Sequence, residues 1–317
     1  MAIFSRATHS THSRMAWLAL ASLAVAATAR QPRSSLRPTA RSLPRPLRRV
    51  PRGGDKLDDI ITIEPLPLAG QVALVTGGGR GIGAAIARAL ATRGAAVAIV
   101  YRDDEAAAAA TAAALPGAGH ATYRCDVGDG DAVAATIAAV EADLGGLDVV
   151  VNNAGVFVEH PILETSYADW RANFEETARV NLHGPANVCY CAARSMAARG
   201  VRGKIVNVGS RGALRGEPRC PAYGATKAAL HALSQSLAAA LAPAGIVVAA
   251  VAPGFVETDM AAAVLDGPDG DGIRAQSGFG RVATVDEVAE AVAFFTSPGA
   301  TWCTGAVLDC NGASYLH

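Results

Sequence analysis

A tyrosine and a lysine spaced four residues apart, Tyr223 and Lys227, have the clearest chemistry in the sequence. They begin a predicted helix, where this spacing places both side chains on one face. A free phenol titrates near pH ~10, too high for ready proton exchange at neutral pH. A neighbouring ammonium favours the phenolate and lowers the pKa of the phenol. Tyr223 could then donate a proton to a carbonyl oxygen or remove one from an alcohol. The alternative is an ordinary pair on a helix surface.

A glycine-rich segment follows the first predicted strand and reads Thr76-Gly77-Gly78-Gly79-Arg80-Gly81-Ile82-Gly83. Glycines allow a sharp turn and let a pyrophosphate approach the next helix, whose free N-terminal N–H groups attract anions. A strand and a helix flank the segment, as a dinucleotide loop requires. We therefore predict a dinucleotide site, with a purely structural glycine turn as the alternative.

The end of the second predicted strand indicates which dinucleotide is bound. An NAD-dependent protein usually has an acid there, which accepts a hydrogen bond from the ribose 2′-hydroxyl. Here the strand ends in Tyr101 and Arg102, and the acids come only afterwards. Guanidinium groups match phosphate oxygens, so Arg102 and Arg80 would pair with a 2′-phosphate. The sequence favours NADP(H) over NAD(H); the alternative is that both arginines are solvated surface charges.

These residues lie in a regular alternation of short apolar runs and Ala-rich stretches. This pattern predicts an α/β fold: a single Rossmann-type doubly wound domain over residues 66–317, with a seven-stranded parallel sheet and helices on both faces. The predicted strands are 71–76, 96–101, 121–125, 148–152, 204–208, 247–251 and 306–309. The predicted helices are 83–92, 104–115, 131–144, 174–198, 223–241 and 285–295. Residues 255–281, rich in Gly and Asp, interrupt the alternation and are predicted to form a lid.

The glycine segment and the Tyr223–Lys227 pair together resemble the T-G-x-x-x-G-x-G and Y-x-x-x-K motifs of the short-chain dehydrogenase/reductase family. Ser210 lies thirteen residues before Tyr223, the spacing that this family uses. The resemblance implies that the Ser210 hydroxyl hydrogen-bonds the substrate oxygen as charge develops there. It implies that Asn181 supports a water linking Lys227 to solvent, and that Lys227 binds the nicotinamide ribose. Asparagine is unfavourable inside a helix, which independently favours a special role for Asn181.

Three further stretches resemble parts of the family's cofactor site. Asp126-Val127 resembles the pair that contacts adenine, and Asn152-Asn153-Ala154-Gly155 resembles the turn in which Asn153 faces the cofactor. Pro253-Gly254-Phe255-Val256-Glu257-Thr258 resembles the segment whose backbone near Val256 and Thr258 hydroxyl hold the nicotinamide carboxamide. The resemblance implies hydride transfer between NADP(H) and a ketone or secondary alcohol, with Tyr223 as general acid/base.

The substrate class is less sharply indicated. The segment after residue 253 is especially similar to 3-oxoacyl-[acyl-carrier-protein] reductases, so a carrier-bound 3-oxoacyl thioester is one option besides a small carbonyl or alcohol. Residues 156–161 and 309–313 depart from that pattern. Arg211, Arg215 and Arg219 could meet an acidic carrier protein or a carboxylated substrate, or merely keep a loop soluble. A non-catalytic NADP-binding sensor or scaffold and a sugar-nucleotide epimerase or dehydratase stay open as alternatives. The resemblance also implies a homotetramer or homodimer.

The net charge is zero, but basic and acidic residues are distributed unevenly along the chain. Residues 1–54 hold ten arginines and no acid, which leaves 18 basic against 28 acidic side chains and a formal charge of −10 for the rest. Nucleic-acid binding is not expected of a body this acidic, because phosphate backbones repel it. The six cysteines contain no C-x-x-C pair, which favours free thiols in a reducing compartment and predicts no metal site.

Residues 1–56 are predicted to be a disordered targeting presequence, because so basic a segment cannot bury enough apolar area to fold. Residues 1–29 resemble a secretory signal: two arginines precede an apolar run that ends in Ala27-Thr28-Ala29, a small-residue cleavage pattern. The run is too short for a comfortable membrane span, so no stable anchor is expected after processing. Residues 30–54 are transit-like, basic and serine-containing. The combination favours a plastid, with the mitochondrion as the alternative.

Overall fold

The structure of the protein is a computed structural model that describes residues 66–316. Its centre is a sheet of seven parallel strands in the order β3-β2-β1-β4-β5-β6-β7. The strands are β1 (Val72–Thr76), β2 (Ala96–Tyr101), β3 (Ala121–Arg124), β4 (Val149–Asn152), β5 (Lys204–Val208), β6 (Val247–Pro253) and β7 (Val307–Cys310). Each predicted strand is present, so the expected fold class is confirmed. The predicted presequence, residues 1–56, lies outside the described residues.

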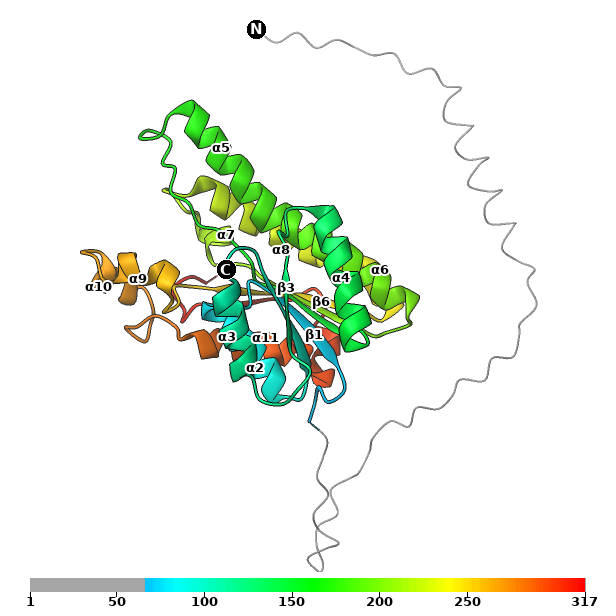
Figure 1. The fold of residues 1–317 in the computed structure, drawn as a ribbon. Coiled ribbons are helices and arrows are strands. Elements are labelled where there is room, and N and C mark those ends of the chain that lie inside the picture. Colours follow the sequence, from blue (N-terminus) through cyan, green and yellow to red (C-terminus); the bar gives the residue numbers. More distant parts are fainter. Residues whose placement is uncertain (1–65, 317) are drawn as a thin grey trace, which may run out of the picture. The chain divides into compact units, whose positions relative to one another are not determined.

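Helices cover both faces of the sheet, as predicted (Figure 1). One face carries α2 (Gly81–Thr92), α3 (Glu105–Ala114) and α11 (Val285–Thr296). The other carries α4 (Gly130–Leu144), α5 (Tyr167–Ala178), α6 (Gly184–Ala198) and α8 (Pro221–Leu241). Shorter helices are α7 (Gly212–Arg215), α9 (Asp259–Leu265), α10 (Gly270–Arg274) and the 3₁₀ turns Ala242–Ala244 and Pro298–Cys303. No helix among residues 66–316 is long and apolar enough to cross a membrane.

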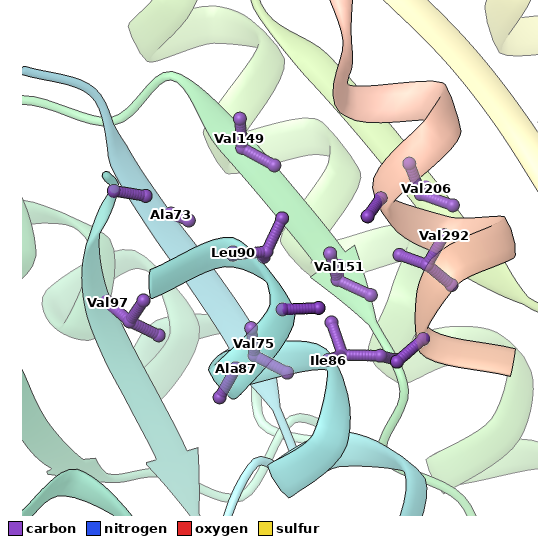
Figure 2. Close-up of a cluster of buried hydrophobic side chains, with 14 of the residues drawn as sticks. Ala73, Val75, Ile86, Ala87, Leu90, Val97, Val149, Val151, Val206 and Val292 are labelled. Carbon is purple, nitrogen blue, oxygen red and sulfur yellow. The ribbon is translucent and has the colours of Figure 1, made fainter. Parts of the chain in front are cut away.

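The two faces of the sheet form two separate hydrophobic clusters. Successive side chains of a strand point to opposite faces, so Ala73 and Val75 of β1 pack into one cluster, while Val72 and Leu74 pack into the other. Figure 2 shows the first cluster, where Ile86 of α2 lies over the sheet. Strands buried on both faces read as continuous apolar runs, which is why the sequence located them so well.

The order of the strands creates the place for a site. The chain runs outward from β1 through β2 to β3, and then returns to the other side of β1 with β4. In open α/β sheets, ligands bind in the crevice at the carboxyl ends of the strands where this direction changes. Thr76 ends β1 and Asn152 ends β4, so the glycine-rich segment and the turn after Asn152 both lie at this crevice.

The helix predicted over residues 174–198 is the clearest difference from the sequence analysis. The structure begins it earlier, at Tyr167, where the Ser166 hydroxyl caps the helix by accepting from the Asp169 amide at 3.2 Å. It is then interrupted by a π-helical turn, Arg179–His183, before α6. The first half was missed because α5 is largely polar and exposed, so hydrophobic periodicity does not mark it.

Residues 255–281, predicted as a lid, contain secondary structure of their own. Two short helices, α9 and α10, occupy much of the segment. Its beginning is tied back to its end, because Val256 and Ala283 form a parallel bridge and the Ala283 amide donates to the Phe255 carbonyl at 3.0 Å. The segment is therefore a closed excursion from the end of β6. Its action as a lid stays a prediction.

Candidate active site

The loop between β1 and α2 has the geometry of an anion cradle. Gly77 and Gly81 have φ of +62° and +53°, in the left-handed region that favours glycine. Gly83 allows the tightest approach, because a Cβ there would lie 2.1 Å from the Gly77 carbonyl oxygen. No side chain caps the N-terminus of α2. The free N–H groups and close-packed glycines therefore fit the pyrophosphate of a dinucleotide.

The turn after β4 holds this loop in place. The Thr76 hydroxyl accepts from the backbone amides of Asn153 and Ala154, both at 3.0 Å. In return, the Asn153 side-chain amide donates to the carbonyl oxygens of Thr76 at 3.0 Å and Gly77 at 3.1 Å. The sequence predicted that Asn153 faces the cofactor. The structure places its amide against the glycine loop, where it positions the backbone that a pyrophosphate would contact.

Four predicted catalytic residues from three parts of the chain meet beside this turn. Ser210, which follows β5, lies close enough to Tyr223, at the start of α8, to lower the pKa of its hydroxyl. The ammonium of Lys227 lies 5.6 Å from the centre of the Tyr223 ring. A Cβ on Gly155 would lie 3.8 Å from Lys227 Nζ and 3.3 Å from Asn181 Oδ1. The fold therefore brings the predicted catalytic residues together next to the glycine loop.

The protonation of the central pair differs from the sequence expectation. Burial raises the pKa of Tyr223 to about 12, although the contact with Ser210 lowers it in part. Burial also lowers the pKa of Lys227 to about 8, and its ammonium donates to the Val208 carbonyl at 2.8 Å. The predicted lowering of the phenol pKa is wrong for this structure, because burial disfavours charge on both groups. At neutral pH Tyr223 is a protonated donor.

Asn181 lies in the π-helical turn and is completely buried. Its side chain pairs with the backbone of Val156: Oδ1 accepts from the amide at 2.8 Å and Nδ2 donates to the carbonyl at 2.9 Å. Single π-turns inside α-helices are frequent at functional sites. This one directs the amide of Asn181 into the turn after β4. The predicted support of a water beside Lys227 stays a prediction.

The segment after β6 approaches the glycine loop from the other side. A Cβ on Gly81 would lie 3.6 Å from the Thr258 side chain, so these two predicted cofactor residues are neighbours. Gly254 is fixed by donation of its amide to the Cys310 carbonyl at 3.1 Å, and the Pro253 carbonyl accepts from the Arg211 amide at 2.9 Å. The predicted nicotinamide end of the site is thus assembled from β6 and the loop that follows it.

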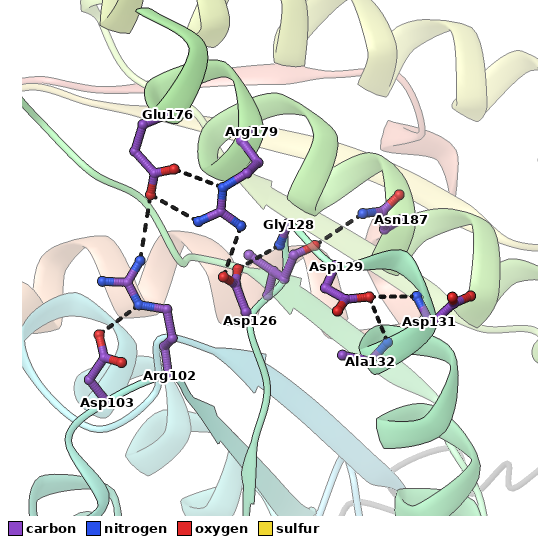
Figure 3. A network of polar contacts seen from close by, with 11 residues as sticks. Arg102, Asp103, Asp126, Gly128, Asp129, Asp131, Ala132, Glu176, Arg179 and Asn187 are labelled. Carbon is purple, nitrogen blue, oxygen red and sulfur yellow. Dashed lines mark hydrogen bonds and ion pairs between the residues drawn. The ribbon is translucent and has the colours of Figure 1, made fainter. Parts of the chain in front are cut away.

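The predicted adenosine end contains a network of charges (Figure 3). Arg102, after β2, pairs with Asp103 at 2.6 Å and with Glu176 of α5 at 3.6 Å. Asp126, after β3, pairs with Arg179 at 2.8 Å. Burial alone would raise the pKa of Asp126, but hydrogen bonds from the Gly128 amide and Arg179 outweigh it and lower this pKa. Glu176 and Arg179 were missed by the sequence analysis because only the fold brings them to β2 and β3.

Two further predicted cofactor residues frame this end. Val127 is almost buried, and a Cβ on Gly184 of α6 would lie only 2.7 Å from its side chain. Its carbonyl accepts from the Asn187 side chain at 3.1 Å. Arg80 is exposed and makes no ion pair with any residue in the described range 66–316. The positive charge of Arg80 is therefore available to a ligand, whereas that of Arg102 is shared with two carboxylates.

The three arginines between Ser210 and Tyr223 have different surroundings. Arg211 is only 4% exposed; its guanidinium donates to Ser314 Oγ at 2.6 Å and Gln276 Oε1 at 3.0 Å. Arg219 pairs with Glu159 at 2.8 Å. Neither alternative from the sequence describes Arg211, which is an internal link rather than a docking or solubilising charge. Within residues 66–316, no cluster of His, Cys, Asp or Glu could hold a metal ion.

The comparisons with known proteins identify the family of the chain. Residues 77–312 match the family model described as enoyl-(acyl carrier protein) reductase. The chain is 39% identical over 247 residues to D-threitol dehydrogenase of Mycolicibacterium smegmatis, covering 77% of this chain and 93% of that protein. It is 37% identical over 247 residues to 3-oxoacyl-[acyl-carrier-protein] reductase of Escherichia coli, covering 78% and 98%. A solved short chain dehydrogenase of Burkholderia cenocepacia in complex with NADP is 36% identical, with a TM-score of 0.70, covering 78% and 99%.

A doubly wound sheet with a glycine cradle and a Ser-Tyr-Lys cluster at its switch point defines a dinucleotide-binding oxidoreductase. The chain belongs to the short-chain dehydrogenase/reductase family. It is an oxidoreductase that acts on CH–OH or C=O groups, as its named relatives do. The family resemblance and the enzyme class predicted from the sequence are thereby confirmed.

Proposed function

We propose that the protein is an NADP(H)-dependent oxidoreductase that reduces a ketone, or oxidises the corresponding secondary alcohol, with Tyr223 as general acid/base. The observation that carries this proposal is the meeting of Ser210, Tyr223 and Lys227 beside the glycine cradle. A phenol, a hydroxyl and an ammonium at that place suit proton transfer to an oxygen next to a nicotinamide ring.

The residues of the cluster divide the work in the direction of reduction. A nicotinamide cofactor, when bound, supplies the hydride chemistry. Tyr223 is protonated at neutral pH and gives its proton to the substrate oxygen. Ser210 donates a hydrogen bond to the same oxygen as negative charge develops there. Lys227 is charged below pH about 8 and stabilises the phenolate that Tyr223 leaves.

Two observations support NADP(H) as the cofactor. Arg80 offers an exposed guanidinium at the glycine loop, and Arg102 lies at the end of β2 where a ribose 2′-substituent is expected. A solved relative of 36% identity holds NADP. The carboxylates around Arg102 act against this preference. The degree to which the protein discriminates NADP(H) from NAD(H) therefore depends on how readily these carboxylates release Arg102.

The charge of the body favours a small substrate over a carrier-bound one. The chain from Asp55 onward has a formal charge of −10, which repels an acidic carrier protein. Arg211 is buried and Arg219 is paired with Glu159, so the predicted basic contact for a carrier is largely occupied. Relatives named for a polyol and for a 3-oxoacyl thioester leave both chemistries for testing.

The test is the variant Tyr223→Phe, which removes the proton donor and leaves the ring in place. We expect kcat for NADPH-dependent reduction, assayed on a panel of ketones with an acetoacetyl thioester, to fall about 10²- to 10⁴-fold. NADPH binding, measured by fluorescence titration, should persist. Tyr190→Phe is the matched control, because Tyr190 is 64% exposed on α6, outside the cluster.

Two outcomes would contradict the proposal. Near wild-type turnover by Tyr223→Phe would remove Tyr223 from the chemistry. A wild-type protein that binds NADPH and reduces none of the substrates would favour the sensor or scaffold alternative.

We propose that residues 1–54 deliver the protein to an organelle, with the plastid favoured over the mitochondrion. The support is compositional: ten arginines without an acid, and an apolar run followed by a basic, serine-containing stretch. The proposal requires that this segment acts as an address independently of the body, which can be tested by dividing the chain after Gly54.

A further inference from the structure

The charges at the adenosine end alternate along a single chain of contacts (Figure 3). Asp103 contacts Arg102, Arg102 contacts Glu176, Glu176 contacts Arg179, and Arg179 contacts Asp126. Three carboxylates thus face two guanidinium groups, which gives the network a formal charge of −1. Without Arg80, which lies outside this network, these five side chains would slightly repel a 2′-phosphate.

The contact between Arg102 and Glu176 differs in kind from the others. Asp103 is adjacent to Arg102 in sequence and belongs to the same loop. Glu176 is on α5, a separate element, so its contact at 3.6 Å joins α5 to the loop after β2. A ligand group that binds Arg102 must share its guanidinium with Glu176 or displace it.

The network allows such an exchange. The side chains of Arg102 and Glu176 are 48% and 42% exposed, and exposed ion pairs contribute little stability. Glu176 also keeps Arg179 as a partner, at 2.7 and 2.9 Å, after Arg102 leaves. The Arg179 contacts hold the Glu176 carboxylate in place and ionised, lowering its pKa, so it stays a competitor at neutral pH.

We infer that Glu176 is a specificity-determining residue: its carboxylate competes with the 2′-phosphate of NADP(H) for Arg102 and reduces discrimination against NAD(H). This inference rests on the proposed function, because it requires a nicotinamide dinucleotide whose 2′-position faces Arg102. A merely structural role for Glu176, tying α5 to the loop after β2, would change the binding of both dinucleotides alike.

The experiment measures the Kd of NADPH and of NADH, by nucleotide fluorescence, for the wild type and for Glu176→Gln. Removing the competing charge should lower the Kd of NADPH about threefold, the order expected for an exposed ion pair. The Kd of NADH should be unchanged, because it carries no 2′-phosphate. Glu175→Gln is the matched control: Glu175 is the neighbouring residue on α5, 70% exposed and paired only with Arg171 among the described residues. It should alter neither Kd.

A second comparison shows whether the effect passes through Arg102. In the Arg102→Gln background, Glu176→Gln should not lower the Kd of NADPH, because the guanidinium for which Glu176 and the 2′-phosphate compete is missing. Equal changes for both nucleotides, no change for NADPH, or a gain that persists without Arg102 would each overturn the inference. In those cases the wild type still binds NADPH. A wild type that binds neither nucleotide would overturn the proposed cofactor together with the inference.

Discussion

At the scale of single residues, the structure buries a charge at the centre of its candidate site. Lys227 is 4% exposed, and burial lowers its pKa from 10.5 to about 8. At pH 7 the group is still an ammonium, so the fold carries the cost of desolvating it, about 3 kcal/mol for a shift of this size. The Val208 carbonyl, which accepts from the ammonium, recovers part of that cost. This residue therefore favours activity at the expense of stability.

The variant Lys227→Met tests whether the buried ammonium lowers stability while it supports activity. The variant should abolish ketone reduction. It relieves the desolvation cost of about 3 kcal/mol but leaves the Val208 carbonyl without its donor, at a cost of ~1–3 kcal/mol. The net gain in stability of about 1 kcal/mol should raise Tm at pH 7 by about 2–4 °C. The gain should vanish by pH 10. Between pH 8 and 10.5 the unfolded wild type binds more protons than the folded one, so wild-type stability rises with pH and the variant lacks this rise.

The control for that experiment lies on β5. Burial also lowers the pKa of Lys204 to about 8, and its ammonium donates to the Ser297 carbonyl. Lys204 is the first residue of β5, at the opposite end of the strand from Ser210 and the candidate site. Lys204→Met should show the same kind of pH-dependent stability with full turnover. If Lys227→Met lowers Tm at pH 7, the buried ammonium is not the dominant cost at that position.

At the scale of elements, the sequence correctly predicted the strands and the glycine loop, which hydrophobic patterning and glycine spacing mark. The strands were found because both faces are buried, and the glycine loop because Gly83 leaves room for no side chain. It could not locate the π-helical turn at Asn181, which depends on the packing of α5 and α6 rather than on any local pattern. Glu176 and Arg179 were missed for the same reason: their partners lie on other elements.

A buried side chain, Arg211, links the segment between β6 and α11 to the candidate site. Arg211 follows Ser210 directly and reaches Gln276 of this segment, Ser314 near the C-terminus and the ring of Phe255, whose centre lies 5.3 Å from its guanidinium carbon. Arg211, Phe255 and Ser314 line a cavity of about 180 Å³. Burial lowers the pKa of Arg211, the nearby Arg215 lowers it further, and Glu217 acts in the opposite direction.

Arg211→Met should free this segment while keeping most of the buried volume. We expect amide hydrogen exchange across α9 and α10 to become about tenfold faster and KM to rise, because the hydrogen bond from Arg211 to Gln276 of this segment is lost together with the bond to Ser314. Arg215→Met is the control. Arg215 also donates to Gln276, at 2.5 Å, but it is exposed and reaches neither Ser314 nor Phe255. Equal exchange rates in the wild type and Arg211→Met would show that the segment is closed by other contacts.

At the scale of the whole molecule, the distribution of charge divides the chain near Asp55. All ten arginines of residues 1–54 precede the first acid, Asp55, while the sheet and both hydrophobic clusters lie between Leu68 and Cys310. Everything assigned to the candidate site falls within that body. The body therefore contains the sheet, both hydrophobic clusters and the candidate site, and residues 1–54 carry a charge opposite to that of the body.

Dividing the chain after Gly54 tests this independence. The chain from Asp55 onward should keep its Tm within about 2 °C, because it retains the sheet and both hydrophobic clusters of residues 66–316. It should bind an anion exchanger at pH 7, since its formal charge falls from zero to −10. It should also bind NADPH as the full chain does. Residues 1–54 fused to a fluorescent protein should carry the reporter into a plastid. If the chain from Asp55 onward aggregates or fails to bind NADPH, the body needs residues 1–54 in order to fold. If the reporter stays in the cytosol, residues 1–54 are not a targeting signal.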